Sequence, residues 1–406
     1  MGQRKIGIIG GGASGMAAAV TAAGQGANVT ILEGNDRMGK KLLATGNGRC
    51  NLGNLELSAD CYFGEDIAFV ADRLAGFNTQ DTVSFFRELG LMIKSKNNYL
   101  YPACEQASAV LDVLRIKIKE LGITVKTECK ICRIAQKDNG ILVSDGREEY
   151  VFDRVIIACG GKAAKNTGSD GSGYLLAEQL GHSLIPTVPA LVALRCKEDY
   201  FKSVAGVRAD ANITLEQESG EPVKERGELQ LTDYGISGIP IFQLSRIAGR
   251  HLMRQKEVTV HIDLLPDYTG EDLKRLYETR ILLAGDKTVE EFFTGMLHKK
   301  IMLLFVRLAG LKAGTPVKEA AKDKIWKVFS LCKDWKVTVV SSNPYENAQV
   351  CAGGVPTGEV TEKLESRKIP GVYFAGEVLD VDGKCGGYNL QWAWCSGYLA
   401  GRAAAE

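Results

Sequence analysis

Histidine is scarce in this sequence, with four residues among 406: His182, His251, His261 and His298. None of them lies in a motif, so we expect each at the surface or in the core. The sequence also lacks a Ser-His-Asp arrangement and a histidine-metal arrangement. It therefore gives no support for a hydrolase, and no metal site is predicted.

A strong charge of one sign and long apolar runs are also missing. Fifty basic and forty-nine acidic residues leave a formal charge of +1, which disfavours a nucleic-acid or anionic-membrane partner. The apolar run "IMLLFV", residues 301–306, ends at Arg307, well short of the ~18 residues of a membrane span. The first ten residues, "MGQRKIGIIG", lack the apolar core of a signal peptide. We expect a cytoplasmic protein with no membrane partner, and the oligomeric state stays open.

Cysteine is not rare, but it lacks the spacing of metal ligands. The eleven cysteines are scattered, and in a reducing cytosol most are expected to be small buried hydrophobic residues. The single C-x-x-C, Cys129 to Cys132, lies in a strand-like segment, where an offset of three places the sulfurs on opposite faces. A redox or zinc role is therefore disfavoured there.

The strongest motif is "RKIGIIGGGASGMAAAVTAAGQGANVTILEG", residues 4–34. A short apolar strand leads into G-x-G-x-x-G, a helix of small residues follows, and a second strand ends at Glu33. In dinucleotide-binding turns the three glycines allow the tight turn, the approach of a pyrophosphate and close helix-strand packing. The helix N-terminus favours phosphate, and the acidic residue can accept hydrogen bonds from a ribose. The predicted contacts are Gly10, Gly12, Ala13, Ser14, Gly15 and Glu33.

A cationic, glycine-rich segment, "GKKLLATGNGRCNLGN", follows at residues 39–54. Its glycines predict a loop rather than a helix. An NAD enzyme would continue here with further βαβ units, whereas FAD has a longer body that needs a second cradle. No histidine or cysteine is placed by a motif as an attachment point, so we expect non-covalent FAD. Cys50 is interpreted as structural or flavin-adjacent rather than as a redox thiol, since a disulfide reductase needs a second nearby cysteine. The residues predicted to meet the pyrophosphate or the flavin are Arg37, Lys40, Lys41, Thr45, Gly46, Asn47, Gly48, Arg49, Cys50 and Asn51.

The next part of the chain alternates between helical and strand patterns. Helical periodicity covers residues 80–90 and 106–122, each ending in glycine. The apolar run "RVIIACGG", residues 154–161, predicts a buried parallel strand that ends at a cofactor crevice. Val125, in the strand-like "ITVKT", and Ala158, Gly160 and Gly161 therefore join the predicted cofactor-binding set.

From about Pro189 the pattern changes to short alternating strands, followed by amphipathic helices predicted at residues 269–283 and 288–310. No motif of its own marks this region. The predicted fold is therefore α/β: a Rossmann-like FAD-binding domain, residues 1–189 and 336–406, with an inserted β-barrel-like and helical domain, residues 190–335.

Five segments carry a resemblance that covers nearly the whole chain: "GGGASGMAAA", "GKKLLATGNGRCN", "IIACGG", "TGSDGSGYLLAEQLGHS" and "FAGEVLDVDGKCGGYNLQWAWCSGYLAG". With them the chain resembles the BaiN-like flavoproteins, also known as aminoacetone oxidase-like FAD-binding enzymes, within the wider succinate dehydrogenase and fumarate reductase flavoprotein group. The resemblance implies that Glu377 takes the position that binds the ribityl chain. It also implies flavin contacts by Gly376, by the pair Gly386 and Gly387, and by the helix N-terminus at Tyr388, Asn389 and Leu390.

The chain departs from the family pattern at two places. Cys351 stands where the family has threonine, and "YLYP", residues 99–102, stands where Arg-Val-Phe-Pro is common. Both segments are expected near the substrate, so the resemblance implies no particular substrate.

The predicted activity is that of an FAD-dependent oxidoreductase. Arg49, Tyr388 and Asn389 are candidates for polarising a substrate, with loop bracing an equal alternative for each. A second G-x-G-x-x-G in a βαβ setting is missing, so NAD(P)H is expected to dock transiently at the flavin. We expect NAD(P)H-dependent reduction of an activated double bond in a small organic substrate. The alternatives are an H2O2-forming oxidase of a small amine or alcohol, and a non-catalytic flavin-binding or RNA-modification accessory protein, which the near-neutral charge disfavours.

Overall fold

The chain folds into two compact units, as a computed structural model that describes residues 3–217, 220–254 and 257–406 shows. Unit 1 contains Met1–Val188 and Tyr345–Glu406, and unit 2 contains Pro189–Pro344. Unit 1 is therefore built from both ends of the chain.

Unit 1 is organised around a five-stranded parallel sheet. Its central strands are almost entirely apolar and buried, as expected for a parallel sheet covered on both faces. This sheet and its crossovers confirm the predicted Rossmann-like α/β fold. In spatial order the strands are β20 (Val372–Phe374), β11 (Arg154–Ile157), β1 (Lys5–Ile9), β2 (Asn28–Leu32) and β7 (Thr124–Lys126).

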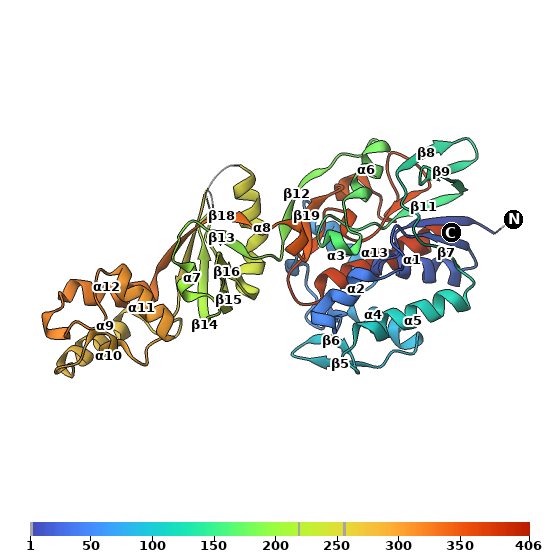
Figure 1. Ribbon diagram of the computed structural model, residues 1–406. Helices are drawn as coiled ribbons and strands as arrows, with labels where there is room; N and C mark the ends of the chain where they lie inside the picture. Colours follow the sequence, from blue (N-terminus) through green and yellow to red (C-terminus); the bar gives the residue numbers. More distant parts are fainter. Residues whose placement is uncertain (1–2, 218–219, 255–256) are drawn as a thin grey trace. The chain divides into compact units, whose positions relative to one another are not determined.

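Two helices rich in small residues, α1 (Ala13–Gly24) and α13 (Tyr388–Ala405), pack side by side (Figure 1). A Cβ added at Gly397 would collide with the carbonyl oxygen of Ser14, and one at Gly401 with that of Ala18. The two backbones approach this closely because neither helix has bulky side chains at the crossing. The crossing joins the first and last helices of the chain.

The remaining elements of unit 1 agree largely with the sequence pattern. The helices predicted at residues 80–90 and 106–122 are α4 and α5. The glycines after them, Gly90 and Gly122, have positive φ values of 89° and 67°. The predicted loop at residues 39–54 is wrong in part, because the glycine-free stretch Lys40–Ala44 forms one helical turn, α2, before the glycines end it. The elements are α2 (Lys40–Ala44), β3 (Gly53–Asn54), β4 (Tyr62–Phe63), α3 (Ile67–Gly76), α4 (Thr79–Glu88), β5 (Ile93–Lys96), β6 (Tyr99–Pro102), α5 (Ala107–Glu120), β8 (Arg133–Lys137), β9 (Gly140–Ser144), β10 (Glu149–Phe152), α6 (Ser172–Gln179), β12 (Ile185–Ala190), β19 (Val350–Gly354) and β21 (Asp382–Gly383), with short 3₁₀ turns at Thr45–Gly48, Ala59–Cys61, Lys165–Thr167, Tyr345–Asn347, Thr357–Glu359 and Gly376–Val378.

Unit 2 contains a closed six-stranded antiparallel barrel and a group of helices. Along β14 the residues Ala211, Ile213 and Leu215 are fully buried and their neighbours are not, which is the alternation of a strand with one face toward a core. The barrel order is β13 (Leu194–Cys196), β16 (Gly235–Ser237), β15 (Val223–Leu231), β14 (Arg208–Leu215), β17 (Val258–Asp263) and β18 (Trp335–Ser342), and the helices are α7 (Phe201–Val204), α8 (Ile239–Met253), α9 (Gly270–Leu282), α10 (Val289–Phe293), α11 (Lys299–Leu308) and α12 (Lys322–Lys333), with a 3₁₀ turn at Val317–Glu319.

Two predictions about unit 2 are wrong in detail. The domain boundary at 335/336 lies too early, because β18 pairs with β13 and β17 and so closes the barrel. The single helix predicted over residues 288–310 is two helices, since Gly295 takes a φ of 83° and the His298 side chain caps the start of α11. Helices α7, α8 and α12 were not predicted.

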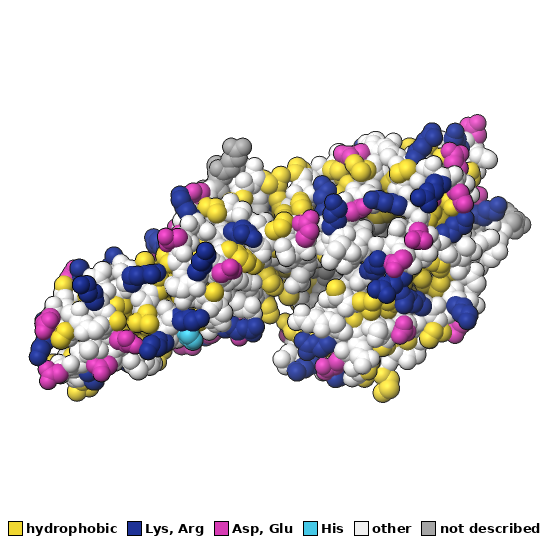
Figure 2. Space-filling view, viewed as in Figure 1, with side chains coloured by type: hydrophobic (Ala, Val, Ile, Leu, Met, Phe, Trp, Pro, Cys, Tyr) yellow, Lys and Arg dark blue, Asp and Glu magenta, His cyan; other side chains and the backbone are white. Residues whose placement is uncertain are grey.

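The surface carries both signs of charge. Figure 2 shows Lys and Arg side chains interspersed with Asp and Glu over the visible face of each unit. Among the described residues, no helix has the length and apolar character needed to cross a bilayer.

Candidate functional site

The first part of the site is the turn between β1 and α1, at the carboxyl end of the parallel sheet. A Cβ at Gly15 would collide with the Gly10 carbonyl oxygen, so this position accepts only glycine. Gly12 is different: it caps α1, and no heavy atom lies within 4 Å of where its Cβ would be. The first helical hydrogen bond runs from Met16 N–H to the Gly12 carbonyl, which leaves the N–H groups of Ala13 and Ser14 directed out of the helix. This is an open cradle for an anion.

The Glu33 carboxylate lies beside this turn and is 7% exposed. One oxygen accepts the Gly11 N–H at 2.8 Å, and the other accepts the backbone N–H and the side-chain amide of Asn35 at 2.8 and 2.7 Å. Asn35 also donates to the Thr167 carbonyl at 3.3 Å. Asn35 was not predicted, although an asparagine two residues after the acidic residue is a common local hydrogen-bonding partner.

Three of the four predicted cations lie in different surroundings. Arg37 is exposed, and Lys40 pairs with Asp36 at 2.7 Å. Lys41 instead reaches inward and pairs with Glu377 at 2.7 Å. Of these three, within the described residues, only Lys41 forms an ion pair with another predicted site residue.

The TGNGRCN segment forms a tight turn with unusual backbone. Gly46, Asn47 and Cys50 have φ values of 56°, 55° and 58°, and the Thr45 hydroxyl donates to the Leu42 carbonyl at 2.6 Å. Gly48 and Asn47 are exposed, but the Cys50 side chain is fully buried. Burial raises the pKa of the Cys50 thiol to about 12, so the thiol is neutral and unreactive near pH 7.

This turn meets the start of α13, which lies more than 330 residues later in the chain. A Cβ added at Gly387 would be 2.7 Å from the Asn51 Oδ1 atom, and the Asn54 side chain donates to the Gly386 carbonyl at 3.2 Å. Within the described residues, Asn51 Oδ1 is buried without a hydrogen-bond partner. The two motifs that the sequence placed at one cofactor are therefore in contact.

The three candidate catalytic side chains have local partners. The Arg49 guanidinium is exposed, donates to the Gly46 carbonyl at 3.3 Å and lies 5.7 Å from the centre of the Tyr101 ring. The Tyr388 hydroxyl donates to the Glu56 carbonyl at 3.2 Å, and burial raises its pKa.

The third candidate, Asn389, is engaged on both sides of its amide. It accepts the Gly383 N–H at 2.8 Å and donates to the Gly383 carbonyl at 2.8 Å. These contacts favour the loop-bracing interpretation for Asn389. Its neighbour Leu390 packs against the core of unit 1.

The end of β11 contributes backbone to the same region. Ala158 donates its N–H to the Ile9 carbonyl at 2.9 Å, and Gly160 takes a φ of 71°. Val125 pairs with Ile31 in the neighbouring ladder. Next to Gly161 the structure places two side chains outside the predicted set, Tyr174 and Cys351.

A buried histidine, His182, makes contacts that no sequence motif predicts. His182 Nδ1 lies 2.7 Å from Glu359, and its Nε2 lies 2.7 Å from the Ser366 hydroxyl. The sequence of contacts from carboxylate to imidazole to serine hydroxyl matches a hydrolytic triad. However, Ser366 is 4% exposed, and its oxygen accepts backbone N–H groups from Lys368 and Ile369. The serine is thus a structural cap, and His182 braces the core of unit 1.

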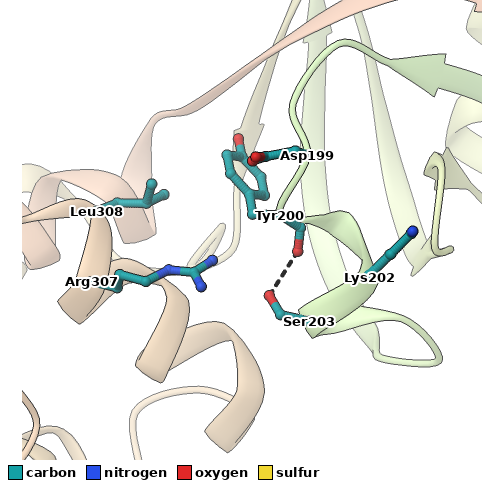
Figure 3. A pocket seen from close by; sticks show the side chains of 6 residues that line it. All are labelled: Asp199, Tyr200, Lys202, Ser203, Arg307 and Leu308. Atoms are coloured by element: carbon teal, nitrogen blue, oxygen red, sulfur yellow. Dashed lines mark hydrogen bonds between the residues drawn. The ribbon is translucent and has the colours of Figure 1, made fainter.

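A hollow lies in unit 2, and none of the residues that line it belongs to a sequence motif. It has a volume of about 360 Å³ between α7 and α11 and is drawn in Figure 3. Exposed charged side chains, among them Arg307 and Lys202, form much of its wall. The predicted site residues all lie in unit 1.

Comparison with known proteins gives matches of full or nearly full length. The family described as HI0933-like protein Rossmann domain matches residues 4–403. The chain is 44% identical, over 407 aligned residues and 100% of both chains, to a 3-dehydro-bile acid delta(4,6)-reductase of Clostridium scindens. It is 28% identical to a ribosomal RNA dihydrouridine synthase of Escherichia coli, with 96% of this chain and 95% of that protein covered. Among solved structures, a 3-ketosteroid delta1-dehydrogenase of Sterolibacterium denitrificans matches with a TM-score of 0.52 at 11% identity, over 100% of both chains.

Proposed function

Because the chain belongs to the HI0933-like Rossmann family, we propose that it reduces a carbon–carbon double bond next to a carbonyl group in a small organic molecule, with NAD(P)H as electron donor. The chain is an FAD-dependent oxidoreductase, and its resemblance to the BaiN-like flavoproteins is confirmed. The observation that carries the proposal is the 44% identity, over the full length of both chains, to a protein named as a double-bond reductase.

The two named relatives support the same reaction type with different substrates. One name states reduction of Δ4,6 double bonds in a 3-dehydro bile acid. The other names dihydrouridine as its product, which is uridine with one ring double bond reduced. Since identity is higher to the small-molecule enzyme, and the net charge of +1 offers little attraction to RNA, we propose a small, carbonyl-bearing, unsaturated substrate.

The residues of unit 1 fit FAD. The α1 N-terminus is open beyond Gly12, and the buried Asn51 Oδ1 and Tyr174 hydroxyl oxygen have no hydrogen-bond partner within the described residues. We propose that the Gly10–Gly15 turn binds the pyrophosphate and that Glu33 binds the ribose. Glu377 would bind the ribityl chain, and the α13 N-terminus would bind the flavin ring. When bound, FAD supplies the two-electron transfer.

The chain itself supplies position and electrostatics. The first-turn N–H groups of α13 have no carbonyl partners within the helix, so they stabilise negative charge placed at its N-terminus. Gly387, with a φ of 95°, and Gly386, with a φ of 128°, allow the backbone to turn into this helix. Neither position tolerates a side chain easily, since an added Cβ at Gly386 would lie 3.0 Å from the Tyr99 ring.

The proposal is tested by anaerobic stopped-flow mixing of the purified holoprotein with NADH and, separately, with NADPH. We expect loss of the flavin absorbance near 450 nm with one of the two. Addition of a 3-oxo-4,6-diene steroid acid should then restore it, with a product that has gained two hydrogens by mass spectrometry. A flavin that neither nicotinamide reduces would contradict the proposed donor.

The same assay separates the alternative functions. An oxidase would be reduced by a small amine or alcohol without nicotinamide and would form H2O2 in air. An RNA-modifying enzyme would be reoxidised by unmodified ribosomal RNA and not by the steroid. A flavin-binding accessory protein would show neither reduction nor reoxidation at a useful rate.

A further inference from the structure

Three polar side-chain atoms converge beside the Gly161 backbone, at the carboxyl end of β11. A Cβ built on Gly161 would lie 2.8 Å from the Tyr174 hydroxyl oxygen, 2.9 Å from Glu377 Oε1 and 3.2 Å from the Cys351 sulfur. These residues come from α6, from the turn after β20 and from β19. Glycine at position 161 is what leaves room for them, in the crevice where a parallel α/β sheet binds its ligand.

Two of the three groups have partners. Glu377 pairs with Lys41 at 2.7 Å, and its other oxygen accepts the Cys351 N–H at 2.8 Å. The Cys351 sulfur accepts the Lys162 N–H at 3.1 Å. The Tyr174 hydroxyl is the exception: the residue is 2% exposed, and within the described residues its oxygen has no hydrogen-bond partner.

Tyr174 lies in a closely packed part of α6. Gly173 packs against Cys159 and Val378, where an added Cβ would lie 3.1 and 3.2 Å from their side chains. The Lys162 ammonium lies 5.7 Å from the centre of the Tyr174 ring. A buried hydroxyl that lies near a carboxylate, and has no hydrogen-bond partner within the described residues, points to a ligand that can hydrogen-bond to both.

We propose that the Tyr174 hydroxyl, together with Glu377, binds the ribityl chain of FAD. A ribityl hydroxyl both donates and accepts, so it can donate to the Glu377 carboxylate and pair with the Tyr174 hydroxyl at the same time. Burial and the nearby Glu377 charge raise the pKa of Tyr174 well above its usual value, which keeps the hydroxyl protonated. The inference rests on FAD as the bound dinucleotide and is independent of the substrate and the electron donor.

The test compares ligands that contain the ribityl chain with one that lacks it. Apoprotein of the wild type and of Tyr174→Phe is titrated with FAD, riboflavin and ADP, by flavin fluorescence quenching for the first two and by calorimetry for ADP. Loss of one net hydrogen bond should weaken FAD and riboflavin binding about threefold to tenfold and leave ADP binding unchanged. FAD release from the diluted holoprotein gives the same comparison without prior removal of the cofactor.

The matched control is Tyr373→Phe. Tyr373 is also buried, at 4% exposure, but its hydroxyl faces the Ala403 carbonyl at 3.5 Å, so none of the three affinities should change. Unchanged FAD and riboflavin affinities in Tyr174→Phe would overturn the proposal and leave a buried water as the hydroxyl's partner. An equal loss of ADP affinity would also overturn it, since it would show general damage to unit 1. None of these outcomes depends on whether the reductase reaction is found.

Discussion

The Lys41 ammonium and the Glu377 carboxylate lie 2.7 Å apart, although 336 positions separate them in the sequence. Lys41 lies on α2, within the cationic segment, and Glu377 lies in the turn after the last strand of the sheet. The pair therefore links the N-terminal and C-terminal portions of unit 1 at the edge of the proposed cofactor site.

Lys41→Met should destabilise the apoprotein by about 1–3 kcal/mol, because it leaves a largely buried carboxylate without its cation. The side chains of Lys41 and Glu377 are 26% and 18% exposed. Urea unfolding at pH 7 measures the change. Lys40→Met is the matched control: its partner Asp36 is 62% exposed, so its effect should stay below about 0.5 kcal/mol. The double variant Lys41→Met, Glu377→Gln should lose less stability than the two single changes added together, and full additivity would mean that the ion pair is not coupled.

Glu33→Ala should weaken FAD binding about tenfold to a hundredfold, since it removes a carboxylate that can accept hydrogen bonds from the ribose. The same carboxylate accepts from Gly11 and Asn35, so the variant should also unfold at a somewhat lower temperature. Asp36→Asn, at an exposed position nearby, is the control for charge. An FAD affinity equal to that of the wild type would show that Glu33 only stabilises its own loop and does not bind the ribose.

Cys50→Ser should keep most of the reductive activity, because the thiol is fully buried and its pKa is raised to about 12 by that burial. Cys129→Ser combined with Cys132→Ser should behave in the same way. The measurement is flavin reduction by the nicotinamide donor, together with FAD content. Activity that disappears in Cys50→Ser while FAD remains bound would revive a redox role for this thiol.

His182 should make unit 1 less stable in mild acid. Burial lowers its pKa below 6.5 even though it contacts Glu359, so the folded state favours the neutral ring. The stabilisation is present above pH 6.5 and is lost as the pH falls through the lowered pKa. His182→Gln should therefore flatten the decline in unfolding free energy between pH 7 and pH 5, measured by urea titration at each pH. If the unfolding free energy of the variant declines as steeply as that of the wild type, groups other than His182 cause the decline.

His261, in unit 2, should act in the opposite direction. Burial alone would lower its pKa, but contacts at 2.7 Å to Glu216 and 2.6 Å to Asp334 outweigh it and raise the pKa. The protonated ring then stabilises the barrel below pH 6.5, and this stabilisation is lost as the pH rises through the raised pKa. The two acids are about half exposed, so the effect should be under about 1 kcal/mol. His261→Gln should remove this loss of stability at higher pH and leave the loss at lower pH that is due to His182. A plot of unfolding free energy against pH should therefore change only on its high-pH side.

Much of unit 1 was predictable because its signals are local. The glycines at positions 10, 12 and 15, the apolar strands on either side and Glu33 all lie within one βαβ unit, so spacing alone places them together. The contact between Asn51 and Gly387 was predictable only through the resemblance, since no local pattern links segments so far apart.

Other features depended on tertiary packing that the sequence pattern does not reveal. Tyr174 looks like an ordinary core residue of a helix, and its hydroxyl stands out only because Gly161 brings it next to Glu377. The end of the barrel was misplaced because β18 is a strand whose partners, β13 and β17, lie far earlier in the chain. The break between α10 and α11 depends on Gly295, which a periodicity argument treats as tolerable within a helix.

The division of unit 1 between the two ends of the chain has a consequence for its synthesis. As the polypeptide leaves the ribosome, residues 1–188 appear first but lack β20 and α13, so one edge of the sheet and the small-residue face of α1 have nothing to cover them. Unit 2 is continuous in sequence, so it can complete its barrel before the C-terminal part of unit 1 has been synthesised. A nascent chain that stops before residue 372 should therefore expose apolar surface, bind chaperones and fail to reach the native fold. A separately expressed Pro189–Pro344 segment should instead fold without chaperones.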